Sequence, residues 1–139
     1  MDVQINWVAV LLATLSTMVV GSVWYMPAVF GKSWSKMVGM TKEKQEKGAG
    51  KAIAVTVVVS FISAFVLAHM TYISSVFYKE SFMVSAFTTA FWLWLGFTAA
   101  RFITHDAFEQ RPTKLTVMNV AHELVTFMVM ALIIGALKP

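Results

Sequence analysis

The sequence predicts an all-α fold: an integral membrane bundle of four transmembrane helices, with an interfacial amphipathic segment after the first helix. Hydrophobic residues make up 58% of the 139-residue chain and charged residues only 13%, and the mean hydropathy is +0.72. Four apolar runs are long enough to cross a hydrocarbon layer about 30 Å thick at about 1.5 Å per residue. No run alternates polar and apolar residues as a barrel strand does, so helices must satisfy the backbone in lipid.

The four predicted helices cover residues 3–26, 51–74, 82–104 and 115–137, and we expect them to form a single transmembrane domain. The first apolar run is too long for a signal peptide and no basic residue precedes it, so we expect it to be retained. The residues between the runs are too few to build a second domain. The longest of these segments, residues 27–50, is predicted to be a cytoplasmic connection.

Basic residues are concentrated in alternate connections. Nine of the eleven Lys and Arg residues lie in or beside the first and third connections, whereas the second connection and the C-terminus hold only Lys79 and Lys138. Because Lys and Arg near the ends of spans are retained in the cytoplasm, we expect both termini on the periplasmic or extracellular side. The chain is thus predicted to lie in the bacterial cytoplasmic (inner) membrane, with the lipid bilayer as its main partner. This topology accounts for the net charge of +4, and we expect no nucleic-acid partner.

The first half of the 27–50 connection predicts an interfacial helix. Pro27 should end or kink the first transmembrane helix. After it, Phe30 and Trp34 recur at helical spacing, with Lys32 and Lys36 on the other face. Such a helix lies on the inner leaflet with its tryptophan at headgroup depth, while the lysine side chains extend toward anionic lipid.

The second half of this connection, residues 41–50, is predicted to be a solvated helical or turn segment that forms a soluble elbow and is closed by Gly48-Ala49-Gly50. Its mixed Lys and Glu residues are alternatively a docking site for an acidic partner. A phosphate-binding loop is not expected, because Gln45 and Ala52 occupy the positions that would need Gly and Ser or Thr.

Small residues recur every four positions on the first two predicted helices. In lipid, such residues let two backbones approach closely, and we expect these stripes to pack the bundle or, alternatively, to form a dimer face. Two shorter pairs are expected to act similarly on the other helices. The residues are Ala9, Ala13, Thr17 and Gly21; Ala52, Thr56, Ser60, Ala64 and Ala68; Gly96 and Ala100; and Ala131 and Gly135.

A polar stripe marks the fourth predicted helix. Thr116, Asn119, Glu123 and Thr126 fall on one face, with His122 beside them. Counting from the start of the helix, Glu123 lies about 12 Å into the hydrocarbon. An unpaired carboxylate at that depth costs roughly 2.5 kcal/mol or more, so we expect Glu123 to have a partner.

Arg101 is the expected partner, because it lies near the cytoplasmic end of the third helix and is long enough to reach inward. One interpretation is a buried ion pair that fixes helix register. The other is a titratable Glu123 beside His122 that couples protons or recognises a cation. The predicted ion or substrate site comprises Glu123, Arg101, His122, Asn119, Tyr25 and Trp24, the last two from the first helix at similar depth.

No catalytic, metal or cofactor site is expected. The chain has no cysteine, and His69 and His122 are separated by about 15 Å along the membrane normal, so one haem cannot bridge them. His105, Asp106 and Glu109 are predicted to lie in the third connection with a loop role. Because no nucleophile is paired with a base, we do not expect an enzyme.

Three segments together resemble a known family. They are Asn6-Trp7; the string from Gly21 to Trp34, which follows the pattern G-x-x-W-Y-x-P-x-x-F-G-x-x-W; and Phe108-Glu109-Gln110-Arg111-Pro112 leading into Asn119 and His122. These residues are similar to the bacterial family called domain of unknown function 1761, over nearly the whole chain. The resemblance implies a small four-helix membrane protein and no particular activity.

Two functions are compatible with this sequence. The first is a small transporter or channel-like oligomer whose polar site lies in the cytoplasmic half of the bundle. The alternative is an accessory or structural subunit of a larger membrane complex, docked through the segment around Trp34 and the small-residue stripes. The known four-helix multidrug exporters carry their essential Glu in the first helix, where this chain has none. The sequence does not identify a substrate, ion or partner.

Overall fold

The computed structural model describes residues 2–139, and its regular elements are all helical. In chain order these are α1 (Trp7–Trp24), α2 (Gly31–Val38), α3 (Lys42–Tyr78), α4 (Phe82–Leu93), η1 (Trp94–Ala99), α5 (Ala100–Phe108) and α6 (Thr113–Ala136). Four helical rods are long and apolar enough to cross a membrane, namely α1, α3, the continuous Phe82–Phe108 rod and α6. The predicted all-α class and the four apolar helices are therefore confirmed.

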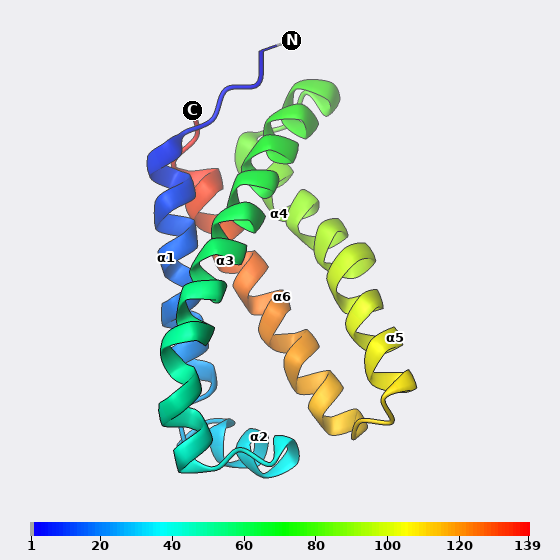
Figure 1. Cartoon of the computed structure of the whole chain (residues 1–139). Helices are drawn as coiled ribbons and strands as arrows, with labels where there is room; N and C mark the ends of the chain where they lie inside the picture. Colours follow the sequence, from blue (N-terminus) through cyan, green and yellow to red (C-terminus); the bar gives the residue numbers. More distant parts are fainter. Residues whose placement is uncertain (1) are drawn as a thin grey trace.

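The four rods run up and down between two ends of the molecule (Figure 1). Both termini and the α3–α4 connection lie at one end, which we call the terminal end. The helix α2 and the α5–α6 connection lie at the other, which we call the α2 end. At the terminal end, Asn6 caps α1 by accepting from the Ala9 amide, and its Nδ2 donates to the Leu137 carbonyl at 3.0 Å. This single side chain therefore joins the two ends of the chain.

The first helix is shorter than its predicted range, since it begins at Trp7 and ends at Trp24. The chain then turns over residues 25–30, which include Pro27, into α2, which forms over the segment predicted to be amphipathic and helical. Gly31 starts α2 in a position where a Cβ atom would overlap the Tyr25 carbonyl oxygen. Only glycine allows this tight approach of α2 to the end of α1.

Of the two conformations expected for residues 41–50, helix or turn, the structure has the helix, and these residues are exposed as expected. The expected end at Gly48-Ala49-Gly50 is wrong, because α3 is one continuous helix of 37 residues from Lys42. The Thr41 side chain caps its first turn by accepting from the Lys44 amide, and a Lys47–Glu43 pair at 2.7 Å supports the next turn. A glycine in a helix costs only about 1 kcal/mol, so Gly48 and Gly50 do not interrupt it.

The third rod also extends beyond its prediction, to Phe108 instead of 104. It contains the π-helical segment η1 between α4 and α5. His105 and Asp106 therefore belong to α5 and not to a loop, which corrects the prediction for these two residues. A π-turn inserts one extra residue into a helix and shifts the direction of the side chains that follow.

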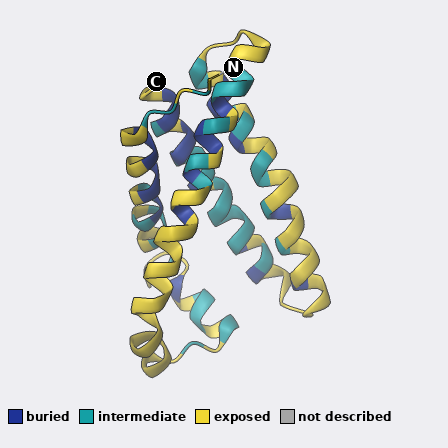
Figure 2. Ribbon diagram, turned by 45° about the horizontal axis from the view of Figure 1, so that its top comes forward, coloured by how far each residue is buried: buried dark blue, intermediate teal, exposed yellow. Residues whose placement is uncertain are grey.

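The core lies near the terminal end, where α1, α3, α4 and α6 pack together and most buried residues gather (Figure 2). The predicted stripes contribute Ala9, Ala13 and Ala64 to this core. Gly135 also contacts α4 closely, as predicted. The prediction that Gly96 and Ala100 pack against another helix is wrong, since both residues are exposed.

Toward the α2 end the bundle opens. The first part of α3, residues 42–59, is exposed throughout, and α5 lies on the opposite side of α6 from it (Figures 1 and 2). The buried core therefore lies near the terminal end, and the two cavities that Glu123 lines lie toward the α2 end.

Candidate functional site

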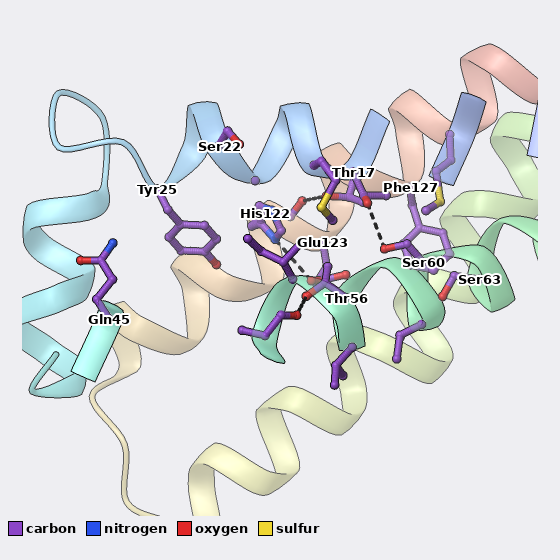
Figure 3. A pocket seen from close by; sticks show the side chains of 18 residues that line it. Thr17, Ser22, Tyr25, Gln45, Thr56, Ser60, Ser63, His122, Glu123 and Phe127 are labelled. Atoms are coloured by element: carbon purple, nitrogen blue, oxygen red, sulfur yellow. Dashed lines mark hydrogen bonds and ion pairs between the residues drawn. The ribbon is translucent and has the colours of Figure 1, made fainter. Parts of the chain in front are cut away.

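A cavity of about 740 Å³ lies between α1, α3 and α6 toward the α2 end. We call it the hydroxyl cavity, because Ser and Thr side chains form much of its polar lining (Figure 3). Glu123 and His122 enter it from α6, and Tyr25 from the end of α1. The hydroxyl-bearing Ser and Thr residues that line it are Thr17, Ser22, Thr56, Ser60, Ser63 and Thr126.

The His122 and Glu123 side chains are partners. Nδ1 of His122 lies 3.3 Å from Oε1 of Glu123, and the two side chains are 14% and 30% exposed. With the proton on Nδ1, the imidazole donates to the carboxylate. With both ring nitrogens protonated, the two groups form an ion pair. A neighbouring histidine thus stabilises the carboxylate that the sequence places deep in the apolar layer.

Aromatic rings enclose His122. The Trp24 and Tyr25 rings lie with centroids 5.8 and 5.0 Å from the imidazole. Tyr25 also donates its hydroxyl to Oδ1 of Asn119 at 3.1 Å. The structure therefore brings together five of the six residues predicted for the site, from the end of α1 and from α6.

Two buried nitrogen atoms in this cluster lack hydrogen-bond partners among the described residues. They are Nε1 of Trp24 and Nε2 of His122. The second faces Gly21, where an added Cβ would lie 3.8 Å away. Since buried polar groups in proteins are nearly always paired, these atoms are available to a water molecule or a small ligand.

Residues predicted for the membrane interface pack on the same cluster. The Phe30 ring lies 4.7 Å from Trp24, and the Trp34 ring lies 5.3 Å from Tyr25. Lys32 and Lys36 are exposed on α2. The helix α2 therefore covers the aromatic side of the site.

The predicted ion pair between Glu123 and Arg101 does not form. Arg101 is exposed on α5, and within residues 2–139 no acidic oxygen lies within 4.0 Å of its guanidinium. Side chains of successive residues on a helix normally point in different directions. The sequence of α6 therefore did not indicate that His122 would contact Glu123. Arg101 and Glu123 do line a second cavity of about 630 Å³ between α3, α6 and the η1–α5 segment, which we call the arginine cavity.

Asp106 joins α5 to α6 beside the arginine cavity. It is buried, and it accepts a hydrogen bond of 2.7 Å from the Thr116 hydroxyl. Arg111, in the connection that follows α5, pairs with Glu109 at 2.5 Å and lies 3.9 Å from Asp106. The hydrogen bond to Glu109, followed by the charge of that carboxylate, raises the pKa of Arg111. This charged cluster holds the α5–α6 hairpin together.

Sequence reasoning missed the hydroxyl lining of the first cavity. Thr17 donates to Ser60 at 2.9 Å, which links α1 to α3 in a buried position. Both residues belong to the small-residue stripes, for which the sequence predicts helix packing or a dimer face and no polar site. Their hydroxyl groups were the available signal, because Ser and Thr can supply hydrogen bonds as well as small volume.

Within the described residues, no group of three or more His, Asp or Glu side chains is arranged to hold a metal ion. His69 lies apart from the site, on α3, with its ring 6.0 Å from Phe65. The polar chemistry of the α2 end therefore depends on the Glu123–His122 pair, the hydroxyl groups and Arg101.

Comparison with known proteins identifies a family for this chain but no activity. No curated protein and no solved structure matches the chain significantly. One family model, described as "Protein of unknown function (DUF1761)", matches residues 8–135. This match covers α3, the third rod, all but one residue each of α1 and α6, and every residue of the site. The chain therefore belongs to the DUF1761 family of proteins of unknown function.

Proposed function

We propose that this chain is a four-pass membrane protein that binds a small cation in the hydroxyl cavity and exchanges it against protons, as a small transporter does. The membrane placement is supported by the four apolar rods and by the exposed apolar residues that cover them. The basic residues of the α2 end favour a cytoplasmic location for that end, with both termini on the periplasmic or extracellular side of the bacterial inner membrane.

One observation carries the choice of a cation. Glu123 is the only acidic side chain among the described residues that line the hydroxyl cavity, and no Lys or Arg lines it. With Glu123 ionised and His122 neutral, the cavity has a formal charge of −1, so a cation complements it. The surrounding hydroxyl oxygens and aromatic rings suit an ammonium group, which donates hydrogen bonds to oxygen and is attracted to ring faces.

The Glu123–His122 pair supplies the proton exchange. A cation that approaches Glu123 competes with the proton on the carboxyl group or on the imidazole, because these positive charges repel one another. Loss of that proton restores the negative charge that holds the cation. Binding of the cation and of the proton are therefore mutually exclusive, which is the requirement for exchange.

The test uses purified protein in liposomes that enclose a pH-sensitive dye. Outward gradients of methylammonium, tetramethylammonium or choline are imposed in turn, and proton movement is followed by dye fluorescence. We expect at least one gradient to drive protons in the opposite direction. Glu123→Gln should reduce this flux by about tenfold or more, because the mutant loses a charged partner worth about 1.5–3 kcal/mol.

Glu46→Gln is the matched control, since Glu46 is exposed on α3 and lines neither cavity. Thermal unfolding in detergent verifies that both variants fold. Unchanged flux in Glu123→Gln would contradict the proposal, and so would the absence of flux with all three cations in the wild-type chain.

An accessory or oligomeric role is the second candidate, and one observation favours it. The first part of α3, residues 42–59, is exposed throughout, including apolar residues such as Ile53, Val55 and Val58. A second copy of the chain, or a subunit of a larger membrane complex, would cover this segment. Native mass spectrometry from mild detergent distinguishes a homodimer from a stoichiometric complex with another protein.

A further inference from the structure

A continuous groove follows the open side of the bundle, between α3 and the third rod. The arginine cavity forms its inner part, near the α2 end, and an apolar cavity of about 510 Å³ adjoins it. Toward the terminal end, another cavity of about 530 Å³ continues the groove. The first two cavities share Ser63, Phe97, Thr98 and Phe127, and the last two share Met70, Leu93 and Phe97.

The groove is polar at one end and apolar along its middle. Arg101 and Glu123 face the inner part. Farther along, the lining consists mainly of apolar side chains such as Ile62, Val66 and Leu93. A molecule with a charged head and a hydrocarbon tail matches this distribution.

The segment η1 builds the wall of this groove. Its residues Phe97 and Thr98 line both the arginine cavity and the apolar cavity. A π-turn is less favourable than an α-helical turn and is frequently found at functional sites. Here it supplies the two side chains at the point where the polar and apolar parts of the groove meet.

Two residues of opposite charge in the inner part of the groove, Arg101 and Glu123, form no ion pair with a Lys, Arg, Asp or Glu side chain within residues 2–139. Arg111, in contrast, is already paired with Glu109 and Asp106. The hydrogen-bond partner of Glu123 is the imidazole of His122, which lines the hydroxyl cavity. A ligand that carries both a phosphate and an ammonium group complements Arg101 and Glu123 together.

The depth of Arg101 agrees with a lipid phosphate. The third rod has 27 residues, which corresponds to about 40 Å, against about 30 Å of hydrocarbon. Arg101 lies seven residues before the end of this rod at Phe108, or about 10 Å along it. With the excess length on the α2 side, Arg101 lies at the boundary between hydrocarbon and headgroups.

We propose that this groove binds one ethanolamine phospholipid, with its phosphate on Arg101, its ammonium group on Glu123 and an acyl chain along Val66, Leu93 and Phe97. This assignment rests on the membrane placement proposed above, but it does not depend on cation exchange. Because Glu123 lines both cavities, the bound headgroup lies next to the cation site.

The test measures lipid binding to delipidated protein by native mass spectrometry. The probes are dioleoylphosphatidylethanolamine, dioleoylphosphatidylglycerol, which has no ammonium group, and glycerophosphoethanolamine, which has no acyl chains. We expect the wild-type chain to bind the ethanolamine lipid more tightly than the other two. Arg101→Gln should weaken that binding about tenfold, because loss of one charged hydrogen-bonding partner lowers affinity by about this factor.

Three further variants keep the result interpretable. Arg101→Lys should restore part of the affinity by retaining the charge. Glu123→Gln should remove the preference for ethanolamine over glycerol headgroups. Val66→Trp should weaken binding of the acyl chain by filling the groove. Lys114→Gln is the control, because Lys114 is exposed at the same end and lines no part of the groove.

Equal binding of the two phospholipids by the wild-type chain would overturn the headgroup assignment. Unchanged affinity in both Arg101→Gln and Val66→Trp would overturn the location. Binding of glycerophosphoethanolamine as tight as that of the lipid would overturn the role of the acyl groove. These measurements do not depend on ion transport. They therefore test the lipid site even if the protein does not exchange cations for protons.

Discussion

His122 occupies a position defined by contacts on several sides. Glu123 approaches one ring nitrogen, the rings of Trp24 and Tyr25 lie against the imidazole, and Gly21 leaves room for the other nitrogen. A side chain in place of the Gly21 hydrogen would be in van der Waals contact with that nitrogen. The imidazole is therefore oriented by its surroundings, so that Nδ1 is directed at Glu123.

The hydrogen bond from Tyr25 to Asn119 gives a prediction at this scale. Tyr25→Phe removes the hydroxyl donor and leaves the Asn119 oxygen without this partner, so the free energy of unfolding should fall by about 1 kcal/mol. Thermal unfolding in mild detergent measures the loss. Tyr78→Phe is the control, because Tyr78 is exposed and its hydroxyl makes no hydrogen bond within residues 2–139. Equal losses in the two variants would contradict a specific role for the Tyr25 bond.

The helices pack by close backbone approach at the terminal end and separate at the other. The Thr17–Ser60 hydrogen bond lies at the transition between the two regions of the α1–α3 pair. On the other side of the bundle, Trp94 of η1 donates to the Val120 carbonyl at 3.0 Å, which holds the π-turn against α6. These two hydrogen bonds hold α1 against α3 and η1 against α6.

Gly135 provides a prediction for the α4–α6 contact. A Cβ atom there would lie 2.6 Å from the Met83 sulfur and 3.1 Å from the Met83 Cα. The sulfur can move, but the Cα requires a shift of α4. Gly135→Ala should therefore lower the free energy of unfolding by about 1–2 kcal/mol, even though alanine favours the helix by up to about 1 kcal/mol.

Gly50→Ala is the matched control for this change. Gly50 lies within α3, and an added Cβ would meet nothing within 4 Å. Its replacement should leave the unfolding temperature in detergent unchanged or raise it. A Gly135→Ala variant as stable as Gly50→Ala would show that α4 and α6 are not in close contact.

The whole molecule has a closed end and an open end, and the basic residues lie mainly at the open one. The core gathers near the termini, whereas both polar cavities and α2 lie at the opposite end. In the proposed orientation, the cavities open toward the cytoplasmic half of the membrane. A solute or lipid headgroup would therefore enter the site from the inner leaflet side.

This orientation predicts a labelling pattern in intact cells. Because the chain has no cysteine, single-cysteine variants report one position each. A membrane-impermeant maleimide should label Lys79→Cys and Lys138→Cys directly. Lys44→Cys should react only after the cells are permeabilised. The reverse pattern would place the termini in the cytoplasm and contradict the proposed direction of the site.

The sequence by itself determined the number of long apolar helices, the class of the fold and the end of the first helix near Pro27. These features are local, since apolar length, caps and charge distribution act within one segment. It also placed Trp24, Tyr25, Asn119, His122 and Glu123 at one depth, because depth follows from counting residues along each helix.

Only the tertiary structure decided which of those residues meet. The His122–Glu123 contact depends on side-chain direction within α6, and the separation of Arg101 from Glu123 depends on the distance between α5 and α6. The π-turn of η1 and the length of α3 also depend on packing and capping that no apolar pattern encodes. Contacts between helices depend on the angles and distances at which the helices pack. The pattern of residues along the sequence does not specify that geometry.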